Sequence, residues 1–398
     1  MMKAKRLYLD AAAATPLSAR VRKELVRLLD VYGNSGALHQ EAVAAKKELD
    51  AARTGVATAI GAHSDEIIFT ASGTEGNNLA IDGTLRHLLH EHGELHAVTT
   101  AIEHASVLEP LRALESDGLY LTELPVDHEG LISTTGLAEA INDETVFVSV
   151  QLVNSEVGTI EPLREVAKVI RHARKERLAQ KNPLPLYLHC DASQAPLWLP
   201  IAVDSLGVDL LTLDAQKVQG PKGVGALYVR RHTQIGPVIR GGVQEFGLRG
   251  GTPNVPLAGA FAVALADAAA GVEERARKVA AVRDALWSDI QKAVPDAVLN
   301  GPHVGTNRVA NNLNISIPGL DAEMCVIALD AEGIAASTRS ACKTDNTEPS
   351  HVINALGTPR ELAQTAVRLT LLPTTTRADT RGVATTLANI AKRYRNVV

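Results

Sequence analysis

Short runs of apolar residues alternate with longer amphipathic segments from about residue 60 to residue 260. The short runs are rich in β-branched and large apolar side chains, as strands buried on both faces are. We expect strands at 66–70, 96–100, 145–152, 186–191, 210–215 and 225–231. We expect helices at 76–92, 105–116, 134–142 and 162–180. This alternation predicts an α/β fold with a mainly parallel central sheet that helices cover on both faces.

The sequence changes character after residue 256. An alanine-rich stretch at 258–294, interrupted by Gly259 and Gly271, predicts a bridging helix or a helix pair. Shorter apolar segments follow at 311–318, 324–337 and 366–372, which is the pattern of a smaller α+β domain. We therefore expect a large domain over residues 17–260 and a small domain formed by residues 1–16 and 261–398.

Composition narrows the classes of function. The 398 residues are 45% hydrophobic and 21% charged, which excludes a disordered chain and a small binding module. The formal charge of -5 gives no global positive field, so we expect neither nucleic acid nor an anionic membrane as a partner. No apolar run approaches the ~18 residues of a membrane span, and the first residues lack the pattern of a signal peptide. We expect a cytoplasmic protein.

Three cysteines are too few and too scattered for a disulfide framework or a four-thiolate zinc site. Cys190 and Cys325 lie in apolar runs, which predicts a structural role. Cys342 lies in a polar loop near Arg339 and Lys343, whose positive charge favours the reactive thiolate, although an exposed cysteine without function fits the same pattern. The histidines within 86–96 are typical of a solvated helix end, and we expect no metal site.

A glycine-bearing turn joins a strand to a helix within residues 69–78. The backbone N–H groups of Gly73, Thr74 and Glu75 at the start of that helix have no intrahelical acceptor, and the helix dipole lies behind them. This arrangement suits a phosphate group. The alternative is an ordinary helix start capped by a serine or threonine.

Two strand ends carry further reactive side chains. Asp191 ends an apolar strand and is followed by Gln194, at the edge of the sheet where ligands bind in open α/β folds, although a lone aspartate there also serves as a cap. Lys217 follows another buried strand. A lysine held against apolar surroundings has a lowered pKa and can form a Schiff base with a carbonyl, whereas the alternative is a surface lysine.

Taken in order along the whole chain, these segments resemble the pyridoxal-phosphate transferases of fold type I. Within them the chain is similar to the cysteine desulfurases of the iron–sulfur type in the class V aminotransferase family. The motifs that carry the resemblance are YLDAAAATP (8–16), GNSGALH (33–39), FTASGTEGNN (69–78), EHASVL (103–108), VNSEVG (153–158), DASQAP (191–196), DAQKVQGPKGVGALYVR (214–230), GLRGGTPNV (247–255), RSAC (339–342), EPSHV (348–352) and VRLTL (367–371).

The resemblance implies a role for each matched residue around the ring of pyridoxal 5'-phosphate. Lys217 holds the cofactor as a Schiff base and moves the Cα proton of the substrate. Asp191 pairs with the protonated ring nitrogen, which keeps the ring an electron sink. Gln194 hydrogen-bonds the ring hydroxyl, and His104 stacks on the ring face and acts as a catalytic residue that relays protons.

The same resemblance assigns the phosphate contacts to Gly73 and Thr74, and Gln216, next to Lys217, is a further cofactor contact. Thr252 matches a residue that reaches the phosphate in the partner subunit, so a homodimer with shared active sites is implied.

The substrate side of the implied site begins with Arg368, which binds the carboxylate of the amino acid through two parallel hydrogen bonds. Asn154, which is also a cofactor contact, and Asn34 lie nearby. Cys342 is the nucleophile of a mobile loop, which the resemblance places in the small domain.

The implied reaction converts L-cysteine to L-alanine and leaves a persulfide on Cys342. The spacing from RSAC to EPS resembles the long-loop subgroup, whose persulfide passes to a sulfur-acceptor protein of iron–sulfur cluster assembly or a thiolation pathway. A selenocysteine lyase, a transaminase or an epimerase of the same family would use Lys217, Asp191 and Arg368 equally. A transaminase or an epimerase would not need Cys342.

The chain departs from the family pattern near the phosphate. Asp214 replaces a serine, Gln216 replaces a histidine, and Phe246 replaces a basic residue. A carboxylate repels a phosphate unless it is protonated, turned away or paired with a cation. These departures motivate a second hypothesis, a catalytically lapsed relative that serves as an assembly or scaffold subunit.

Overall fold

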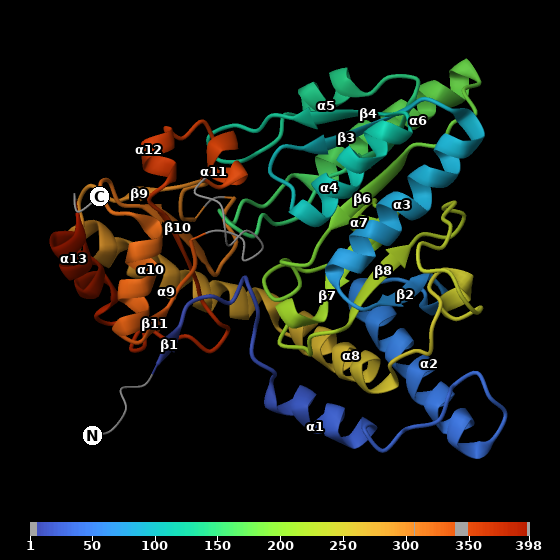
Figure 1. The fold of residues 1–398 in the computed structure, drawn as a ribbon, viewed down its shortest axis with the longest axis horizontal. Helices are drawn as coiled ribbons and strands as arrows, with labels where there is room; N and C mark the ends of the chain where they lie inside the picture. The colour runs from blue at the N-terminus through green and yellow to red at the C-terminus, as the bar shows by residue number, and fades with distance from the viewer. Residues whose placement is uncertain (1–5, 306, 339–348, 396–398) are drawn as a thin grey trace.

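The computed structural model describes residues 6–305, 307–338 and 349–395. A seven-stranded sheet forms the centre of the larger lobe (Figure 1), in the order β2–β8–β7–β6–β5–β3–β4. Within this sheet β8 alone runs antiparallel to its neighbours, so the expected mainly parallel sheet is confirmed. The strands are β2 (Ile67–Thr70), β3 (Leu95–Thr100), β4 (Leu119–Leu124), β5 (Thr145–Ser149), β6 (Tyr187–Asp191), β7 (Leu210–Asp214) and β8 (Gly225–Val229).

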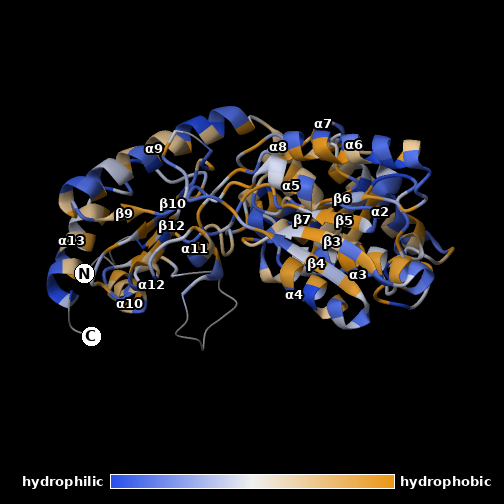
Figure 2. Cartoon of the chain, turned by 90° about the horizontal axis from the view of Figure 1, so that it is seen from above, coloured by the Kyte–Doolittle hydropathy of each residue, from blue (hydrophilic) through white to orange (hydrophobic). Residues whose placement is uncertain are grey.

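Helices cover both faces of this sheet, because successive strand residues point to opposite sides and both sides are apolar. Phe147 packs in the apolar cluster of α3 (Gly73–His92) and α4 (Ala105–Ala113). Val148, the next residue, packs in the cluster that contains α6 (Leu163–Gln180). Figure 2 shows the apolar strands between these two layers of helices. The short helices α5 (Thr134–Ala140) and α7 (Val203–Leu206) complete the α6 side.

Two strands differ from the sequence prediction. β4 is an edge strand whose central residues are partly exposed, so it lacks the continuous apolar run that marks the other strands. β5 ends at Ser149 and not at residue 152. Beyond Ser149 the backbone N–H of Gln151 donates to the carboxylate of Glu103 (2.7 Å), so a side chain replaces the neighbouring strand as its partner.

The alanine-rich stretch forms a helix pair, α8 (Val255–Ala269) and α9 (Val272–Ala293), which confirms the second form of that prediction. Gly271 separates them in the left-handed conformation (φ 61°), which glycine adopts without strain. Within the described residues no single helix is long and apolar enough to cross a membrane. α8 and α9 meet that test of length and composition only together, with a bend of 72° between them.

The smaller lobe lies beyond α9 (Figure 1). Its three-stranded antiparallel sheet has the order β12–β10–β9, and β1 pairs with β11 in a separate parallel pair. The strands are β1 (Leu7–Tyr8), β9 (Val298–Leu299), β10 (Asn312–Ser316), β11 (Ile334–Ala335) and β12 (Ala366–Thr370). The helices are α10 (Ala322–Ala331), α11 (His351–Ala355), α12 (Arg360–Ala363) and α13 (Val383–Tyr394).

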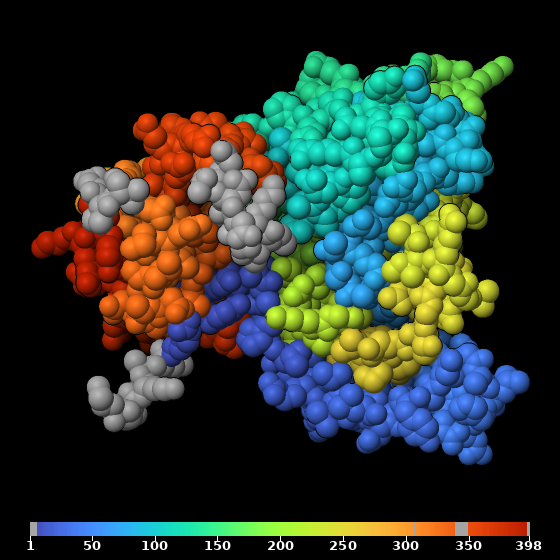
Figure 3. All heavy atoms as spheres, in the orientation of Figure 1, coloured from blue at the N-terminus to red at the C-terminus, as the bar shows by residue number. Residues whose placement is uncertain are grey.

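The N-terminal segment connects the two lobes. After β1 the chain leaves the smaller lobe and reaches α1 (Ala19–Leu28) and α2 (Gln40–Ile60) beside the larger one, as the blue spheres of Figure 3 show. Neither helix is among the elements expected from the apolar pattern of the sequence. The backbone of Thr15 bonds to the carbonyl of Gln216 (2.9 Å), which holds the segment against the end of β7.

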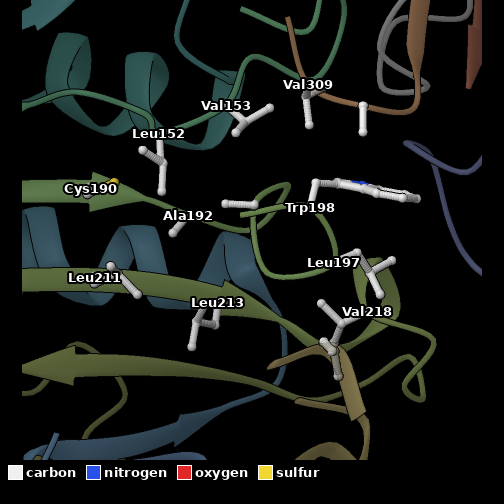
Figure 4. Packing of buried hydrophobic residues seen from close by; sticks show 14 of the residues in the cluster. Leu152, Val153, Cys190, Ala192, Leu197, Trp198, Leu211, Leu213, Val218 and Val309 are labelled. Carbon is white, nitrogen blue, oxygen red and sulfur yellow. The ribbon is translucent and has the colours of Figure 1, made fainter. Parts of the chain in front are cut away.

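Apolar side chains fill the space around β6 and β7 (Figure 4). Cys190 lies on β6 in this cluster, and burial raises the pKa of its thiol well above the ordinary value. Cys325 is also buried, and the pKa of its thiol is raised to about 12. Both cysteines are therefore inert packing residues, as their apolar neighbours in the sequence predicted.

Candidate active site

A cavity of about 280 Å³ lies at the carboxyl ends of β6 and β7. The start of α3, the N-terminal segment and β12 complete its walls. Most of the residues expected to act on a cofactor and substrate line this one cavity: Gly73, Thr74, His104, Asp191, Gln194, Gln216, Lys217 and Arg368.

One end of the cavity is built to accept an anion. Ser72 caps α3 by accepting a hydrogen bond from the backbone N–H of Glu75 (3.1 Å), so the cap uses one of the three N–H groups expected to face an anion. The N–H groups of Gly73 and Thr74 at the helix start have no intrahelical acceptor. A Cβ atom at Gly73 would lie 3.1 Å from the Oγ of Ser193, which leaves little room for any other residue. The sequence-predicted cradle is therefore part of this cavity.

Asp214 lies against the same cradle, because its carboxylate would be 3.3 Å from a Cβ atom at Gly73. Gln216 provides two hydrogen bonds to that carboxylate, from its backbone N–H (3.1 Å) and from its side-chain amide (3.0 Å). The amide of Gln216, expected to contact the cofactor, is thus directed to a carboxylate. The departure noted in the sequence thus places a carboxylate beside the start of α3, within reach of the charge of Lys217.

Lys217 lies in the middle of the cavity, at the end of a single 3-10 turn after β7. Its ammonium donates to the carbonyl oxygens of Ala12 (2.9 Å) and Ala13 (2.7 Å). Burial lowers the pKa of this amine, and the carboxylate of Asp214 opposes that effect. Gln194 donates to the same carbonyl of Ala12 (2.9 Å), so the N-terminal segment fixes both side chains.

Asp191 is the last residue of β6 and lines the same cavity as Lys217. One carboxylate oxygen accepts the backbone N–H of Ser193 (2.9 Å), and the other accepts the amide of Asn77 (2.8 Å). His104 lines the cavity from the N-terminus of α4, and burial lowers the pKa of its imidazole. A carboxylate and a neutral imidazole therefore face the same space.

Arg368 reaches the cavity from β12, with its side chain 2% exposed. The guanidinium donates to the carboxylate of Asp10 (2.9 Å) and to the carbonyl of Ser155 (3.1 Å). Its Nε has no hydrogen-bond partner within the described ranges. A buried guanidinium with an unused donor suits the carboxylate of a small substrate.

Three expected residues lie outside the cavity wall. Asn154 is buried behind it, where its side chain accepts the backbone N–H groups of Glu156 (2.8 Å) and Val157 (2.9 Å). Thr252 lines a separate hollow of about 280 Å³. Asn34 lies in the exposed loop between α1 and α2. Cys342, the expected nucleophile, lies outside the described residues.

The structure adds polar residues that the sequence analysis did not single out. Asn77, Ser106, Gln151, Ser193 and Asp10 contact the cavity or its polar side chains. Asn77 stands four residues after Gly73 on α3, so the two share a helix face. That spacing was available in the sequence, whereas the position of Asp10 depends on its pairing with Thr370 at the end of β12, which is far away in the chain.

Known proteins resemble this chain over nearly its full length. The Aminotransferase class-V family matches residues 7–382. A cysteine desulfurase IscS of Dictyoglomus turgidum is 39% identical over 392 residues, which cover 98% of this chain and 96% of that protein. Among solved structures, a NifS-like protein is 30% identical with a TM-score of 0.88, covering 98% of this chain and 100% of the other. A structure of SspA in complex with cysteine is 32% identical with a TM-score of 0.78, covering 92% and 99%.

Proposed function

The chain belongs to the class-V aminotransferase family, and from that premise we propose that it is a cysteine desulfurase that converts L-cysteine to L-alanine with a persulfide formed on Cys342. The observation that carries this proposal is the single cavity that gathers the start of α3, Lys217, Asp191 and Arg368. The start of α3 suits an anion, and Lys217 suits an aldehyde. Asp191 suits a protonated ring nitrogen, and Arg368 suits a carboxylate.

The cavity fits pyridoxal 5'-phosphate, the cofactor of this family. When bound, the cofactor supplies an aldehyde that combines with amines and a protonated ring that withdraws electrons from the Cα of the substrate. The cradle at Gly73 and Thr74 would hold its phosphate and Asp191 its ring nitrogen. Lys217 would hold its aldehyde. Asp214 is the exception, since its carboxylate disfavours the phosphate.

We assign the remaining roles to residues of this chain as part of the proposal. Arg368 binds the substrate carboxylate, and the position of its guanidinium in the cavity wall supports this role. The lowered pKa of Lys217 favours the neutral amine, which can accept the Cα proton at Nζ. His104 and Gln194 position the ring. Gln216 contributes less to cofactor binding than the other residues, because its side-chain amide donates to Asp214.

Cys342 supplies the sulfur chemistry in this proposal. Its thiolate forms a sulfur–sulfur bond with the substrate thiol while the carbon–sulfur bond breaks, and the electron pair of that bond stays on Cβ, which takes up a proton to give alanine. The described residues that flank 339–348 lie beside the cavity. Ser337 pairs with the backbone of Arg368 (2.7 Å), and Ser350 donates to the carboxylate of Glu156 (2.5 Å).

The proposal includes partners. A second copy of the chain would cover the exposed apolar side chains of two adjoining regions, and Thr252 and Asn34 lie in or near them. These side chains are Val26, Leu29, Tyr32, Leu38 and Val43 around α1 and α2, and Val238, Ile239, Val243 and Phe246 in the loop after β8. A sulfur-acceptor protein would take the persulfide sulfur. We propose the reducing cytoplasm as the compartment, because it keeps Cys342 available as a thiol.

We also propose that the two lobes are the two expected domains, with residues 17–260 binding the cofactor. Residue 260 lies within α8, so the division falls inside a helix. The smaller domain would carry the cysteine loop.

The function is tested by measuring alanine formation from L-cysteine with the purified protein and with Cys342→Ser. We expect alanine and an added sulfur mass on Cys342 in the parent, and the loss of both in the variant. Cys190→Ser is the matched control, because that thiol is buried, and it should leave both signals unchanged.

Other outcomes separate the alternatives. Alanine formation that persists in Cys342→Ser removes persulfide chemistry from the reaction. A parent that binds the cofactor through Lys217 but forms no alanine from L-cysteine contradicts the proposal, and selenocysteine is the next substrate to try. Inactivity with every amino acid would favour the scaffold hypothesis.

A further inference from the structure

A chain of hydrogen bonds joins Asp191 to His104 through two buried side chains. The amide nitrogen of Asn77 lies 2.8 Å from the carboxylate of Asp191 and 2.8 Å from the Oγ of Ser106. The Oγ of Ser106 lies 2.8 Å from Nδ1 of His104. Asn77 is 1% exposed and Ser106 is 8% exposed. The three bonds cross from β6 to α3 and then to the start of α4.

Chemistry fixes the direction of donation along this chain. A carboxylate only accepts, so Asn77 presents its NH₂ group to Asp191. Reversing the amide would set its oxygen against the carboxylate. The second hydrogen of the same NH₂ goes to the Oγ of Ser106, whose own hydroxyl hydrogen is then free to be donated to Nδ1 of His104.

Nδ1 of His104 accepts a second hydrogen bond, from the backbone N–H of Ser106 (3.1 Å). Since two donors point at this nitrogen, it carries no hydrogen, and the neutral ring has its hydrogen on Nε2. The charged groups that face His104 are Asp191 on β6, Lys217 after β7, Glu156 after β5 and His351 on α11. Burial is the largest effect and lowers the pKa of His104, with Lys217 and His351 acting in the same direction and the two carboxylates opposing it.

We propose that Asn77 and Ser106 are positioning residues that hold His104 in the form with its hydrogen on Nε2 and connect that form to the carboxylate of Asp191. This inference rests on the proposed function, in which Asp191 and His104 both contact the cofactor ring. To gain a proton, His104 must lose the hydroxyl donation from Ser106. The chain therefore sets the pH below which His104 becomes charged.

The test compares the holoenzyme with Ser106→Ala and Ser106→Thr. The visible absorption of the bound cofactor and the kcat for alanine formation are measured against pH. Removing the hydroxyl takes away a bond to the neutral imidazole, so the pKa of His104 rises. We expect the acid-side midpoint of both profiles to move up by about half to one pH unit in Ser106→Ala, from the usual worth of one neutral hydrogen bond. Ser106→Thr, which retains a hydroxyl, should restore the parent midpoint.

Asn77→Ala tests the other end of the chain, with Asn78→Ala as its matched control. Asn78 is the next residue on α3 and donates to the carbonyl of Thr74 (2.9 Å). In protein labelled with ¹⁵N at histidine, Asn77→Ala should change the Nδ1 and Nε2 signals of His104, and Asn78→Ala should leave them unchanged. Should Asn77→Ala fail to fold, the Ser106 pair decides the question.

Identical midpoints in the parent and Ser106→Ala would overturn the inference. So would a uniform loss of kcat or of bound cofactor at every pH, because a purely structural defect does not shift a midpoint. A parent that makes no alanine refutes the proposed function alone, since the absorption profile and the histidine signals still report on the chain.

Discussion

At the scale of single residues, the least expected feature is the carboxylate of Asp214 beside the anion cradle. It lies against Gly73 and takes both hydrogen-bond donors of Gln216. Two charges of like sign in a partly buried site repel more strongly than they would in water. With a phosphate in the proposed cradle, this carboxylate would weaken cofactor binding.

Asp214→Ser removes that repulsion and releases the amide of Gln216 toward the phosphate. We expect the Kd for pyridoxal phosphate to fall by about tenfold, a gain of ~1.4 kcal/mol. Titration of the cofactor-free protein by visible absorption measures this Kd.

Asp204→Ser is the matched control, because it removes the same charge from a side chain that is 91% exposed. It should leave the Kd unchanged. Weaker cofactor binding in Asp214→Ser would show that the carboxylate supports the site and does not oppose it.

At the scale of elements, a buried ion pair attaches the loop after β8 to the body of the larger lobe. Arg53 on α2 makes two bonds of 2.7 Å to Glu245, which also accepts the backbone N–H of Phe69 on β2 (2.8 Å). Glu245 and Phe246 both have positive φ (48° and 58°), a strained conformation for residues other than glycine. The ion pair holds this strained turn in place.

Arg53→Met leaves the carboxylate of Glu245 buried without its partner. Breaking such a pair costs about 3–5 kcal/mol, and we expect a loss of that size in the free energy of unfolding measured with urea. The same variant should weaken association between copies of the chain, because the exposed apolar residues of the loop lose their fixed position.

Arg27→Met provides the comparison, since Arg27 pairs with Glu24 and Glu48 but is 50% exposed. Its loss should cost less than ~1 kcal/mol. Equal losses in the two variants would contradict a special role for the buried pair.

At the scale of the whole molecule, the segment after β5 carries a buried carboxyl group where it joins the two lobes. The backbone of Ile160 bonds to that of Asn307 in the smaller lobe (2.8 Å). The neighbouring Glu161 is buried, with one oxygen accepting the backbone N–H of Ile132 (3.3 Å). Burial raises the pKa of Glu161 to about 8. The folded protein therefore keeps a proton that the unfolded chain releases near its ordinary pKa of 4.5.

This shift makes the folded state less stable as pH rises. The stability that depends on the proton of Glu161 is fully present below the pKa that this group has in the unfolded chain. It is lost as the pH rises toward about 8. Glu161→Gln stays neutral, so at about pH 9 its free energy of unfolding should exceed that of the parent by ~1–3 kcal/mol, with little difference near pH 5.

Urea unfolding at the two pH values measures this difference, and Glu165→Gln, which changes an exposed carboxylate on α6, is the control. Parallel pH curves for the parent and Glu161→Gln would show that Glu161 does not hold the proton.

The amino-acid sequence by itself determined the sheet, its covering helices and most of the chemistry of the cavity. Strand and helix periods are local properties, so the buried strands β2, β3 and β5 to β8 follow from their apolar runs. A glycine turn before a helix and polar residues at strand ends are also local signals. They predicted Gly73, Asp191 and Lys217, which the structure brings into one cavity.

Only the tertiary structure decided which distant groups complete that cavity. The carbonyl of Ala12 that binds Lys217 is 205 positions away in the chain, and Asn77 is 114 positions from Asp191. No sequence period reports such distances, because they arise when helices, strands and the N-terminal segment pack against each other. The same packing turned Asn154 into a support behind the cavity wall and paired Arg368 with Asp10. The sequence thus determined the residue types and the helix and strand periodicity of apolar residues. Tertiary packing determined which distant side chains and backbone groups became hydrogen-bond partners.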